Sequence, residues 1–525
     1  MQYTFRTDAS HQIGTGHVMR CLTLAHALRE RGAECRFICR EHRGNLLERI
    51  REQGFAAVAL PTETTEGEHP NPAAASALAH AEWLGTDWRS DAEATQKALG
   101  DTISDWLIVD HYALDHHWES ALRPHCRKIL VIDDLADRNH DCDLLLDQNL
   151  VADQERRYNG KLPDHCARLL GPQYALLQPQ YAELHPRTPP REGPIRRILV
   201  YFGGADRDNL TGLVLSAFLS MQRKDITLDV VINSDAPHAD AIREQVQGVQ
   251  QVMLHTHRPS LAPLMVQADL AIGAAGTTSW ERCSLGLPSL VITLAENQRP
   301  IAAELERQGV IRWLGHKDEV NNESLVDALA DLTRHGLAPE WSARCQQWID
   351  GKGTERVCLL LQLNQNTPLR ARLARLDDEA LILRWANDPL VRKNAFTAEK
   401  IDPDTHRAWF YKRLRDLENC RLYIVETEAG LLVGQVRFER SRGAWEVHYA
   451  MDVRCRGRGI GVSMLNTAVK TFRCLYPLET LFGRVKPENS ASCKIFTSLG
   501  FVKETKPHEL IFWYGSRVSG AIDFH

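Results

Sequence analysis

Two glycine-rich loops near opposite ends of the chain constrain its fold more than any other feature. The first, Gly14-Thr15-Gly16-His17, follows a strand-like run at residues 3–7 and opens a helical pattern. The second, at residues 454–461, has the spacing R-x-x-G-x-G and precedes an amphipathic stretch at 462–472. Backbone N–H groups and the helix dipole favour an anion at such a helix start. The loops therefore predict two separate phosphate-binding sites on two different folds.

Length and charge narrow the class of protein. A chain of 525 residues is too long for one hydrophobic core and predicts three or four domains. A net charge of -5 gives no basic field for nucleic acid or an anionic membrane. The 13 cysteines form no Cys-x-x-Cys pair and no zinc-type cluster, which indicates reduced thiols. Because the start lacks a signal-peptide pattern and no apolar run approaches about 18 residues, we expect a cytoplasmic protein.

Residues 1–178 and 179–363 each alternate strand-like runs with helical periodicity, which is typical of parallel sheets with crossover helices. A proline-rich crossing at 178–194 separates the halves. Ligands of such sheets bind beyond the carboxyl ends of strands, so we expect the loops at 14, 111, 203, 276 and 297 to face one cleft. Strands are expected at 3–7, 35–39, 56–60, 106–110, 129–132 and 144–146, and then at 197–202, 226–232, 251–254, 270–272 and 289–293.

A polar break at residues 364–368 precedes a third domain, 367–525, of different character. A helix is expected at 377–387, followed by an antiparallel meander at 421–426, 432–438 and 445–451. The predicted fold class is α/β for the first two domains, followed by an α+β domain.

The first domain carries a specific resemblance. Residues 6–20 (RTDASHQIGTGHVMR), with Asp110-His111-Tyr112 and Asp133-Asp134, resemble the UDP-2,4-diacetamido-2,4,6-trideoxy-β-L-altropyranose hydrolases of pseudaminic acid biosynthesis. The resemblance covers nearly all of residues 1–360. It implies a GT-B fold, made of two Rossmann-like halves, and the transfer of a UDP-linked sugar to water.

Hydrolysis at an anomeric carbon needs a general base and a stabilised diphosphate leaving group. His17, at a helix start beside glycines, is the expected base, and the motif around it favours this role over simple capping or packing. Tyr112 follows a strand end and is expected to hold the sugar or the attacking water, with Asp110 and His111 as supporting partners. The motif residues expected to contact substrate are Arg6, Asp8, Gly14 and Gly16.

The second half offers a matching nucleotide site at residues 273–281, which follow a strand and open a helix. Amides and hydroxyls at Gly276 and Thr277 are expected to meet the diphosphate, and Glu281 the ribose hydroxyls. The other expected contacts in this half are Gly203, Gly204, Asn297 and Gln298. No glycosidase-type carboxylate pair and no metal-ligand cluster is recognisable, so no metal is expected.

The C-terminal domain resembles the GNAT acetyltransferases. Their acetyl-CoA signature is matched by Arg454-x-x-Gly457-x-Gly459, and their second cofactor segment by residues 485–501. The resemblance implies acetyl-CoA as co-substrate and a splay between two strands, where an amine attacks the thioester and backbone N–H groups polarise the carbonyl. The expected cofactor contacts are Arg454, Gly457, Arg458, Gly459, Ile460, Gly461, Asn489 and Ser492.

One position departs from the GNAT pattern. Many of these enzymes have a tyrosine where this chain has Phe496, and that tyrosine protonates the departing thiolate. Cys493, Ser492 or a water are alternatives here, as is departure without a dedicated acid. Residues 383–389 also resemble the branch that acetylates the 4-amino group of UDP-amino-sugars, which implies acceptor contacts at Trp385 and Asn387.

The resemblances together imply a bifunctional enzyme acting on a UDP-amino-sugar and then on the UDP-diacetamido-sugar, without a nucleic acid or membrane partner. One alternative is a GT-B glycosyltransferase with a sugar or lipid acceptor, which an exposed apolar patch near Gly14 would favour. Another is a regulatory module in which the GNAT domain only senses acetyl-CoA. The sequence leaves the sugar stereochemistry and the oligomeric state open.

Overall fold

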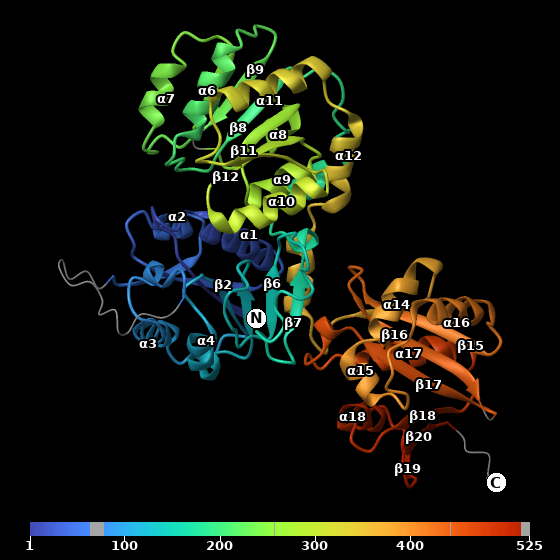
Figure 1. The fold of residues 1–525 in the computed structure, drawn as a ribbon. Helices are drawn as coiled ribbons and strands as arrows, with labels where there is room; N and C mark the ends of the chain where they lie inside the picture. The colour runs from blue at the N-terminus through green and yellow to red at the C-terminus, as the bar shows by residue number, and fades with distance from the viewer. Residues whose placement is uncertain (63–77, 257, 442, 516–525) are drawn as a thin grey trace. The chain divides into compact units, whose positions relative to one another are not determined.

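The computed structural model describes residues 1–62, 78–256, 258–441 and 443–515. They form two compact units, one within residues 1–358 and one within 359–525 (Figure 1). Of the stretch 63–96, where the sequence predicts a loop and one or two helices, residues 63–77 lie outside the described residues. The remainder holds a 3-10 turn, η2 (Ala81–Leu84), and most of α3 (Trp88–Leu99).

The first sheet of unit 1 is parallel, with the strand order β3-β2-β1-β4-β5-β6-β7. Successive strands run outward in both directions from β1 and β4, so the loops after these two strands leave the sheet side by side at a switch point where ligands bind. The strands are β1 (Gln2–Thr7), β2 (Glu34–Arg40), β3 (Ala56–Leu60), β4 (Trp106–Asp110), β5 (Ile129–Ile132), β6 (Leu144–Asp147) and β7 (Ala167–Leu170), and the other helices are α1 (Gly16–Glu30), α2 (Leu47–Glu52) and α4 (His116–Leu122).

The second sheet repeats this plan with the order β10-β9-β8-β11-β12-β13 and a switch point between β8 and β11. Apolar clusters bury both of its faces. Its strands are β8 (Arg197–Tyr201), β9 (Thr227–Val231), β10 (Val252–His255), β11 (Leu270–Ala274), β12 (Ser289–Thr293) and β13 (Arg312–His316), and its helices are α6 (Leu210–Ser220), α7 (Ala239–Gln245), α8 (Ala262–Gln267), α9 (Thr277–Ser284), α10 (Arg299–Arg307), α11 (Asn322–His335) and α12 (Pro339–Trp348).

Two helices join the halves of unit 1. Helix α5 (Pro179–Leu184) lies in the crossing, and α13 (Gly353–Gln362) returns from the second half to contact the first. The Thr354 hydroxyl donates to the carbonyl of Leu177 at 2.7 Å. A β-carbon at Gly353 would lie only 2.2 Å from the Ala175 carbonyl oxygen, so glycine is required for this close approach. The start of α13 therefore packs against the segment at residues 175–177, where the first half of the unit ends.

Unit 2 has one mixed sheet in the order β14-β15-β16-β17-β18-β20-β19, antiparallel except between β17 and β18. These two strands pair only at Trp445 with Leu481 and Glu446 with Phe482. The strands are β14 (Leu369–Leu373), β15 (Cys420–Thr427), β16 (Leu432–Ser441), β17 (Ala444–Met451), β18 (Leu481–Val485), β19 (Val502–Thr505) and β20 (Leu510–Tyr514), and the helices are α14 (Glu379–Ala386), α15 (Pro389–Asn394), α16 (Pro403–Arg415), α17 (Gly461–Leu475) and α18 (Ser490–Ser498).

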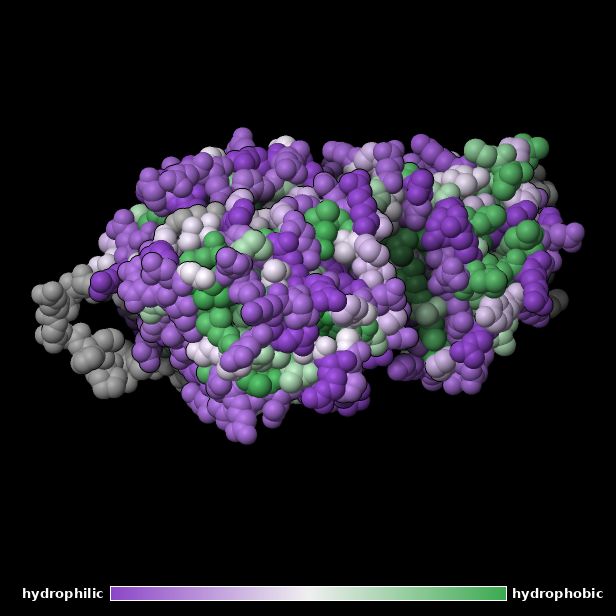
Figure 2. Space-filling view, turned by 90° about the horizontal axis from the view of Figure 1, so that it is seen from above, coloured by the Kyte–Doolittle hydropathy of each residue, from purple (hydrophilic) through white to green (hydrophobic). Residues whose placement is uncertain are grey.

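The surface is mostly hydrophilic on the face that Figure 2 shows, and apolar residues gather there only in small groups. Within the described ranges, no helix combines the length and the apolar character needed to cross a membrane.

Candidate active sites

A histidine and a carboxylate meet at the switch point of the first sheet. His17 lies on the first turn of α1, and its Nδ1 is 2.6 Å from Oδ1 of Asp110 at the end of β4. Arg20, one turn further along α1, donates to both oxygens of Asp110 at 2.6 Å. Burial alone would raise the pKa of Asp110, but Arg20 and His17 outweigh it and hold this pKa below its usual range. The ionised carboxylate fixes the proton on Nδ1 and leaves Nε2 as the basic nitrogen.

Tyr112 packs against the base. Its ring meets the His17 ring edge-on, with 4.7 Å between centroids, and its hydroxyl donates to Oδ1 of Asp134 at 2.5 Å. The other oxygen of Asp134 accepts from the Asn149 amide at 3.1 Å and lies 3.7 Å from Arg20. The bond to Asp134 fixes the Tyr112 ring, and this ring holds the His17 imidazole in place through their edge-on contact. The contact of Tyr112 with sugar or water stays a prediction.

The same cluster continues into the second half of unit 1. Asn149 accepts a hydrogen bond from the Trp280 indole at 3.2 Å, and Gln148 donates to the Thr277 hydroxyl at 3.3 Å. Helix α9, which begins directly after the glycine loop that follows β11, is thereby joined to the loop after β6. The sequence did not single out Gln148 and Asn149, although they lie just after the strand predicted at 144–146, and this position is a signal for a ligand-facing loop.

The glycines of the expected phosphate loops lie open. A β-carbon at Gly14, Gly16, Gly203 or Gly276 would meet nothing within 4 Å, and Gly14 and Gly203 have left-handed φ values of +83° and +100°. No side chain covers these glycines, although the Gly14 N–H itself donates to the Ser10 carbonyl at 2.8 Å. A diphosphate cradle would therefore use the N–H groups in the first turns of α1 and α9. Gly204 differs, because a β-carbon there would lie 2.5 Å from the Asn233 amide. The contact of Gly204 with substrate stays a prediction.

Three further predicted contacts lie around α9 and η6 (Glu296–Gln298). Burial raises the pKa of Glu281 to about 7, although Tyr181 and Arg282 favour its ionised form. Gln298 accepts from the Leu294 amide at 2.8 Å, and Asn297 beside it is exposed. Asn297 is thus accessible to a ligand, while part of the Gln298 amide is occupied locally.

Arg6 and Asp8 correct an expectation. Both side chains are fully buried, and the Arg6 guanidinium is enclosed between Asp8 at 2.6 Å and Asp91 at 2.6 Å. The other oxygen of Asp8 faces His111 at 3.4 Å and His42 at 3.7 Å. These residues form an ionic layer beneath the site, so they do not contact substrate as the sequence motif suggests. Burial of a charged pair depends on partners far away in the chain, which the motif alone does not reveal.

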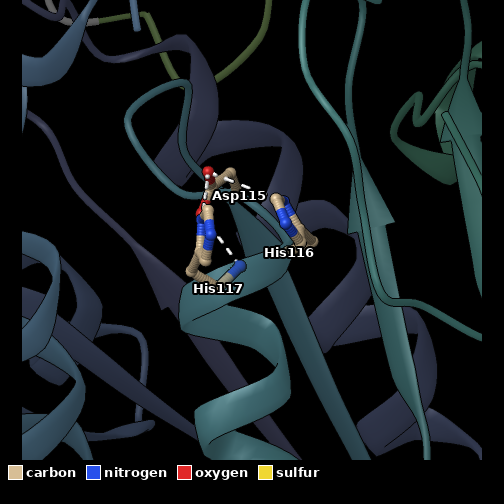
Figure 3. Close-up of side chains that lie close together, drawn as sticks. All are labelled: Asp115, His116 and His117. Carbon is tan, nitrogen blue, oxygen red and sulfur yellow. Dashed lines mark hydrogen bonds and ion pairs between the residues drawn. The ribbon is translucent and has the colours of Figure 1, made fainter. Parts of the chain in front are cut away.

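Asp115, His116 and His117 form the one group in the described part of the chain whose potential metal-ligand atoms all lie within 4.8 Å of one another (Figure 3). The Asp115 carboxylate caps α4, since it accepts from the His117 backbone at 3.0 Å and faces the His117 ring at 3.0 Å. Helix capping accounts for this arrangement, and the expected absence of a metal stays a prediction.

In unit 2, the second glycine loop is anchored by Asp452. Its carboxylate accepts from the Arg454 backbone at 2.9 Å, from the Arg454 guanidinium at 2.7 Å and from the Trp385 indole at 2.8 Å. Gly457 and Gly459 have φ values of +68° and +72°, and a β-carbon on either glycine would meet no atom within 3.4 Å. The loop backbone is therefore open as a pyrophosphate cradle needs, and Arg458 supports it by donating to the Arg454 carbonyl at 3.1 Å.

Buried apolar contacts hold the helices after this loop. Ile460 is 1% exposed, and a β-carbon at Gly461 would lie 2.7 Å from Ile495 of α18. Asn489 caps α18 by accepting from the Ser492 backbone at 3.2 Å. The start of α17 at Gly461 therefore packs against Ile495 of α18.

The two predicted acceptor contacts, Trp385 and Asn387, both have partners within unit 2. Trp385 is 3% exposed and its indole is bound to Asp452, so it supports the cofactor loop. Both ends of the Asn387 amide bind the backbone of Ile401, at 2.9 and 2.8 Å. Each side chain therefore pins one segment of unit 2 to another, and the contact of Asn387, which is half-buried, with an acceptor stays a prediction.

Comparison with known proteins agrees with this division. A family model described as glycosyltransferase family 28 C-terminal domain matches residues 197–355, and one described as acetyltransferase (GNAT) domain matches residues 369–502. A glycosyltransferase-like unit is fused to an acetyltransferase domain. The predicted fold class, a GT-B fold followed by an α+β GNAT domain, is confirmed.

Three curated proteins are similar to the chain. Uncharacterized protein MJ1062 of Methanocaldococcus jannaschii is 21% identical over 97% of this chain and 98% of its own length. Spore coat polysaccharide biosynthesis protein SpsG of Bacillus subtilis is 32% identical over 32% of this chain and 50% of its own. UDP-2,4-diacetamido-2,4,6-trideoxy-beta-L-altropyranose hydrolase of Campylobacter jejuni is 23% identical over 59% of this chain and 97% of its own.

Proposed function

We propose that the chain is a bifunctional enzyme that carries out two consecutive steps of pseudaminic acid synthesis. Unit 2 transfers the acetyl group of acetyl-CoA to the 4-amino group of UDP-4-amino-4,6-dideoxy-N-acetyl-β-L-altrosamine. Unit 1 hydrolyses the resulting UDP-2,4-diacetamido-2,4,6-trideoxy-β-L-altropyranose to the free sugar and UDP. Similarity to a hydrolase of that substrate over 97% of its length supports the second step, and the GNAT match supports the first.

The His17–Asp110 pair is the observation that carries the hydrolase assignment. With Nδ1 bound to the Asp110 carboxylate at 2.6 Å, Nε2 of His17 accepts a proton from water, and the carboxylate stabilises the imidazolium that forms. The water oxygen bonds to the anomeric carbon as the bond to the diphosphate oxygen breaks. Backbone N–H groups in the first turns of α1 and α9 stabilise the charge on departing UDP.

Water is favoured over a lipid acceptor by the surface near the first loop. The large apolar side chains that are exposed in the described part of the chain include none from residues 8–20. A glycosyltransferase that takes a lipid acceptor needs an apolar face beside the reacting carbon. The chemistry of unit 1 therefore fits hydrolysis better than transfer to lipid.

One incubation tests both steps. The full chain is mixed with the UDP-4-amino-sugar, with and without acetyl-CoA, and the acetylated nucleotide and UDP are quantified by chromatography. We expect the acetylated nucleotide only with acetyl-CoA, followed by UDP release. Acetyl-CoA binding without transfer would support the sensor alternative, and UDP release that requires an added sugar or lipid would support a glycosyltransferase.

A further inference from the structure

A gap opens in the sheet of unit 2. Beyond Glu446 and Phe482, strand β17 continues on β16 to Met451, and β18 continues on β20 to Val485, but the two strands no longer pair with each other. Their facing edges thus carry backbone groups that an extended thioester arm can bind, as a peptide binds a sheet edge. The side chains of β17 also become more exposed at this point. Residues 444–447 are buried, whereas His448 and Tyr449 are half-buried.

The hydroxyl of Tyr449 spans this gap on one face of the sheet. It donates to the Ser492 hydroxyl at 2.7 Å, which joins β17 to the first turn of α18, the helix that follows β18. The Tyr449 ring lies 6.0 Å from the ring of Phe496. Burial raises the pKa of Tyr449 to about 12, so the phenol keeps its proton at neutral pH.

Phe496 itself offers no proton. Its ring is 2% exposed and stacks on Phe512 with 5.3 Å between centroids, and a β-carbon on Gly483 would lie 2.4 Å from its Cζ. The ring therefore packs against β18 and β20. Tyr449 places a phenol next to the position where this chain lacks one.

We propose that Tyr449 is the proton donor to the thiolate that leaves during acetyl transfer, with Ser492 as the group that returns its proton. The assignment rests on the acetyl transfer proposed above. The amine nitrogen bonds to the acetyl carbon, and the carbon–sulfur bond breaks with its electron pair on sulfur. The Tyr449 hydroxyl turns its proton from Ser492 to this sulfur to give the free thiol, while the Ser492 hydroxyl donates to the phenol oxygen. The phenolate regains a proton through the Ser492 hydroxyl from solvent, which has received the proton lost by the amine.

A matched pair of variants tests the rate. Tyr449→Phe removes the donor, and Tyr423→Phe removes a buried hydroxyl of β15 that has no partner in the described part of unit 2. We expect Tyr449→Phe to lower kcat for acetyl transfer by about 10²-fold or more, with little change in KM for acetyl-CoA, because general acid catalysis contributes on this scale. Tyr423→Phe should stay within about twofold. A folded Tyr449→Phe protein with near wild-type kcat overturns the proposal.

A second measurement does not depend on the acceptor. CoA is bound to the full chain, and its thiolate is titrated by ultraviolet absorbance in the wild type and in Tyr449→Phe. A hydrogen bond from the phenol stabilises the bound thiolate, so the thiol pKa of CoA should be lower on the wild type than on the variant. Equal values contradict the assignment. If the values differ but no UDP-amino-sugar is acetylated, Tyr449 retains its role and the proposed acceptor is wrong.

Discussion

Nδ1 of His17 lies 2.6 Å from Oδ1 of Asp110, although the two residues are 93 positions apart in the chain. Neighbouring parallel strands produce this contact, because the helix after β1 begins beside the end of β4. Removal of the imidazole by His17→Ala should abolish UDP release while UDP still binds, since the N–H groups at the starts of α1 and α9 remain. Product release by chromatography and UDP binding by calorimetry measure the two effects. His26→Ala, further along the same helix where the imidazole contacts Gln53 instead of Asp110, is the control, and near wild-type turnover in His17→Ala would refute the assignment.

Asp110→Asn should leave the imidazole in place but remove the charge that fixes its tautomer. A loss of about 10³- to 10⁴-fold in kcat is expected, by analogy with other His–Asp pairs. The measurement is kcat for UDP release across a pH series, with circular dichroism to check folding, because Arg20 also loses its ionic partner. A folded variant with an unchanged rate would mean that Asp110 does not orient His17.

Replacement of Gly459 by Leu should block acetylation. Its φ of +72° strains any side chain, and a side chain there enters the open space over the loop. Hydrolysis of a pre-acetylated substrate by unit 1 should continue. Gly430→Leu imposes the same strain in the turn between β15 and β16, where φ is +84°, and should leave acetylation intact. Loss of hydrolysis in folded Gly459→Leu protein would show that the two sites are coupled.

Hydrolysis should survive treatment with EDTA. The proposed mechanism uses His17 and backbone amides, and the one histidine–carboxylate group of metal-like spacing among the described residues caps α4. UDP release is measured before and after chelation, and again after Mg²⁺ or Zn²⁺ is restored. The variant His117→Ala should keep full activity. Activity that disappears with EDTA and returns with a metal would overturn this prediction.

His448 should make the stability of unit 2 depend on pH. Burial and the nearby arginines lower its pKa from 6.5 to about 3. Between about pH 6.5 and pH 3, His448 is protonated in the unfolded chain but stays neutral in the folded chain. The free energy of unfolding is therefore highest above pH 6.5 and falls as the solution is acidified. The charged groups around it are Arg413, Arg437, Arg484 and Glu446.

The test compares thermal melting at neutral pH and at about pH 5 for the wild type, His448→Gln and the exposed control His508→Gln. His448→Gln should lose less stability on acidification than the wild type, whereas His508→Gln should behave like the wild type. An identical loss in all three proteins would remove His448 as a source of the pH dependence.

The sequence predicted most elements of unit 1 because its strands are buried apolar runs. Residues 56–60, 106–110, 129–132 and 289–293 were assigned with the boundaries that the structure shows. Strand β13 was missed because its residues, Arg312–His316, include a glycine and are mostly half-buried. In unit 2, β18 and β19 were not predicted either, because β18 contains Gly483 and β19 is short and polar. Such strands form because neighbours pair with them, which a local pattern does not show.

The site residues also differ in whether a local sequence pattern reveals them. Loop glycines and His17 were accessible from local motifs, since a strand, a glycine turn and a helix start are consecutive in the sequence. Asp134, Asn149 and Tyr449 gain their roles from partners in other strands and helices. The same applies to Arg6, whose charge reads as a ligand contact in the motif but is enclosed by Asp91. Distant pairing of this kind requires the folded structure.

The return of α13 to the first half has a consequence for biosynthesis. Thr354 and Leu177, which it joins, are 177 residues apart. On the ribosome, the first half therefore emerges long before the helix that completes it, and it waits with the surface around Ala175 and Leu177 uncovered. Closure over so long a separation is slow relative to local folding. Nascent chains of unit 1 should thus engage chaperones until synthesis has passed residue 362.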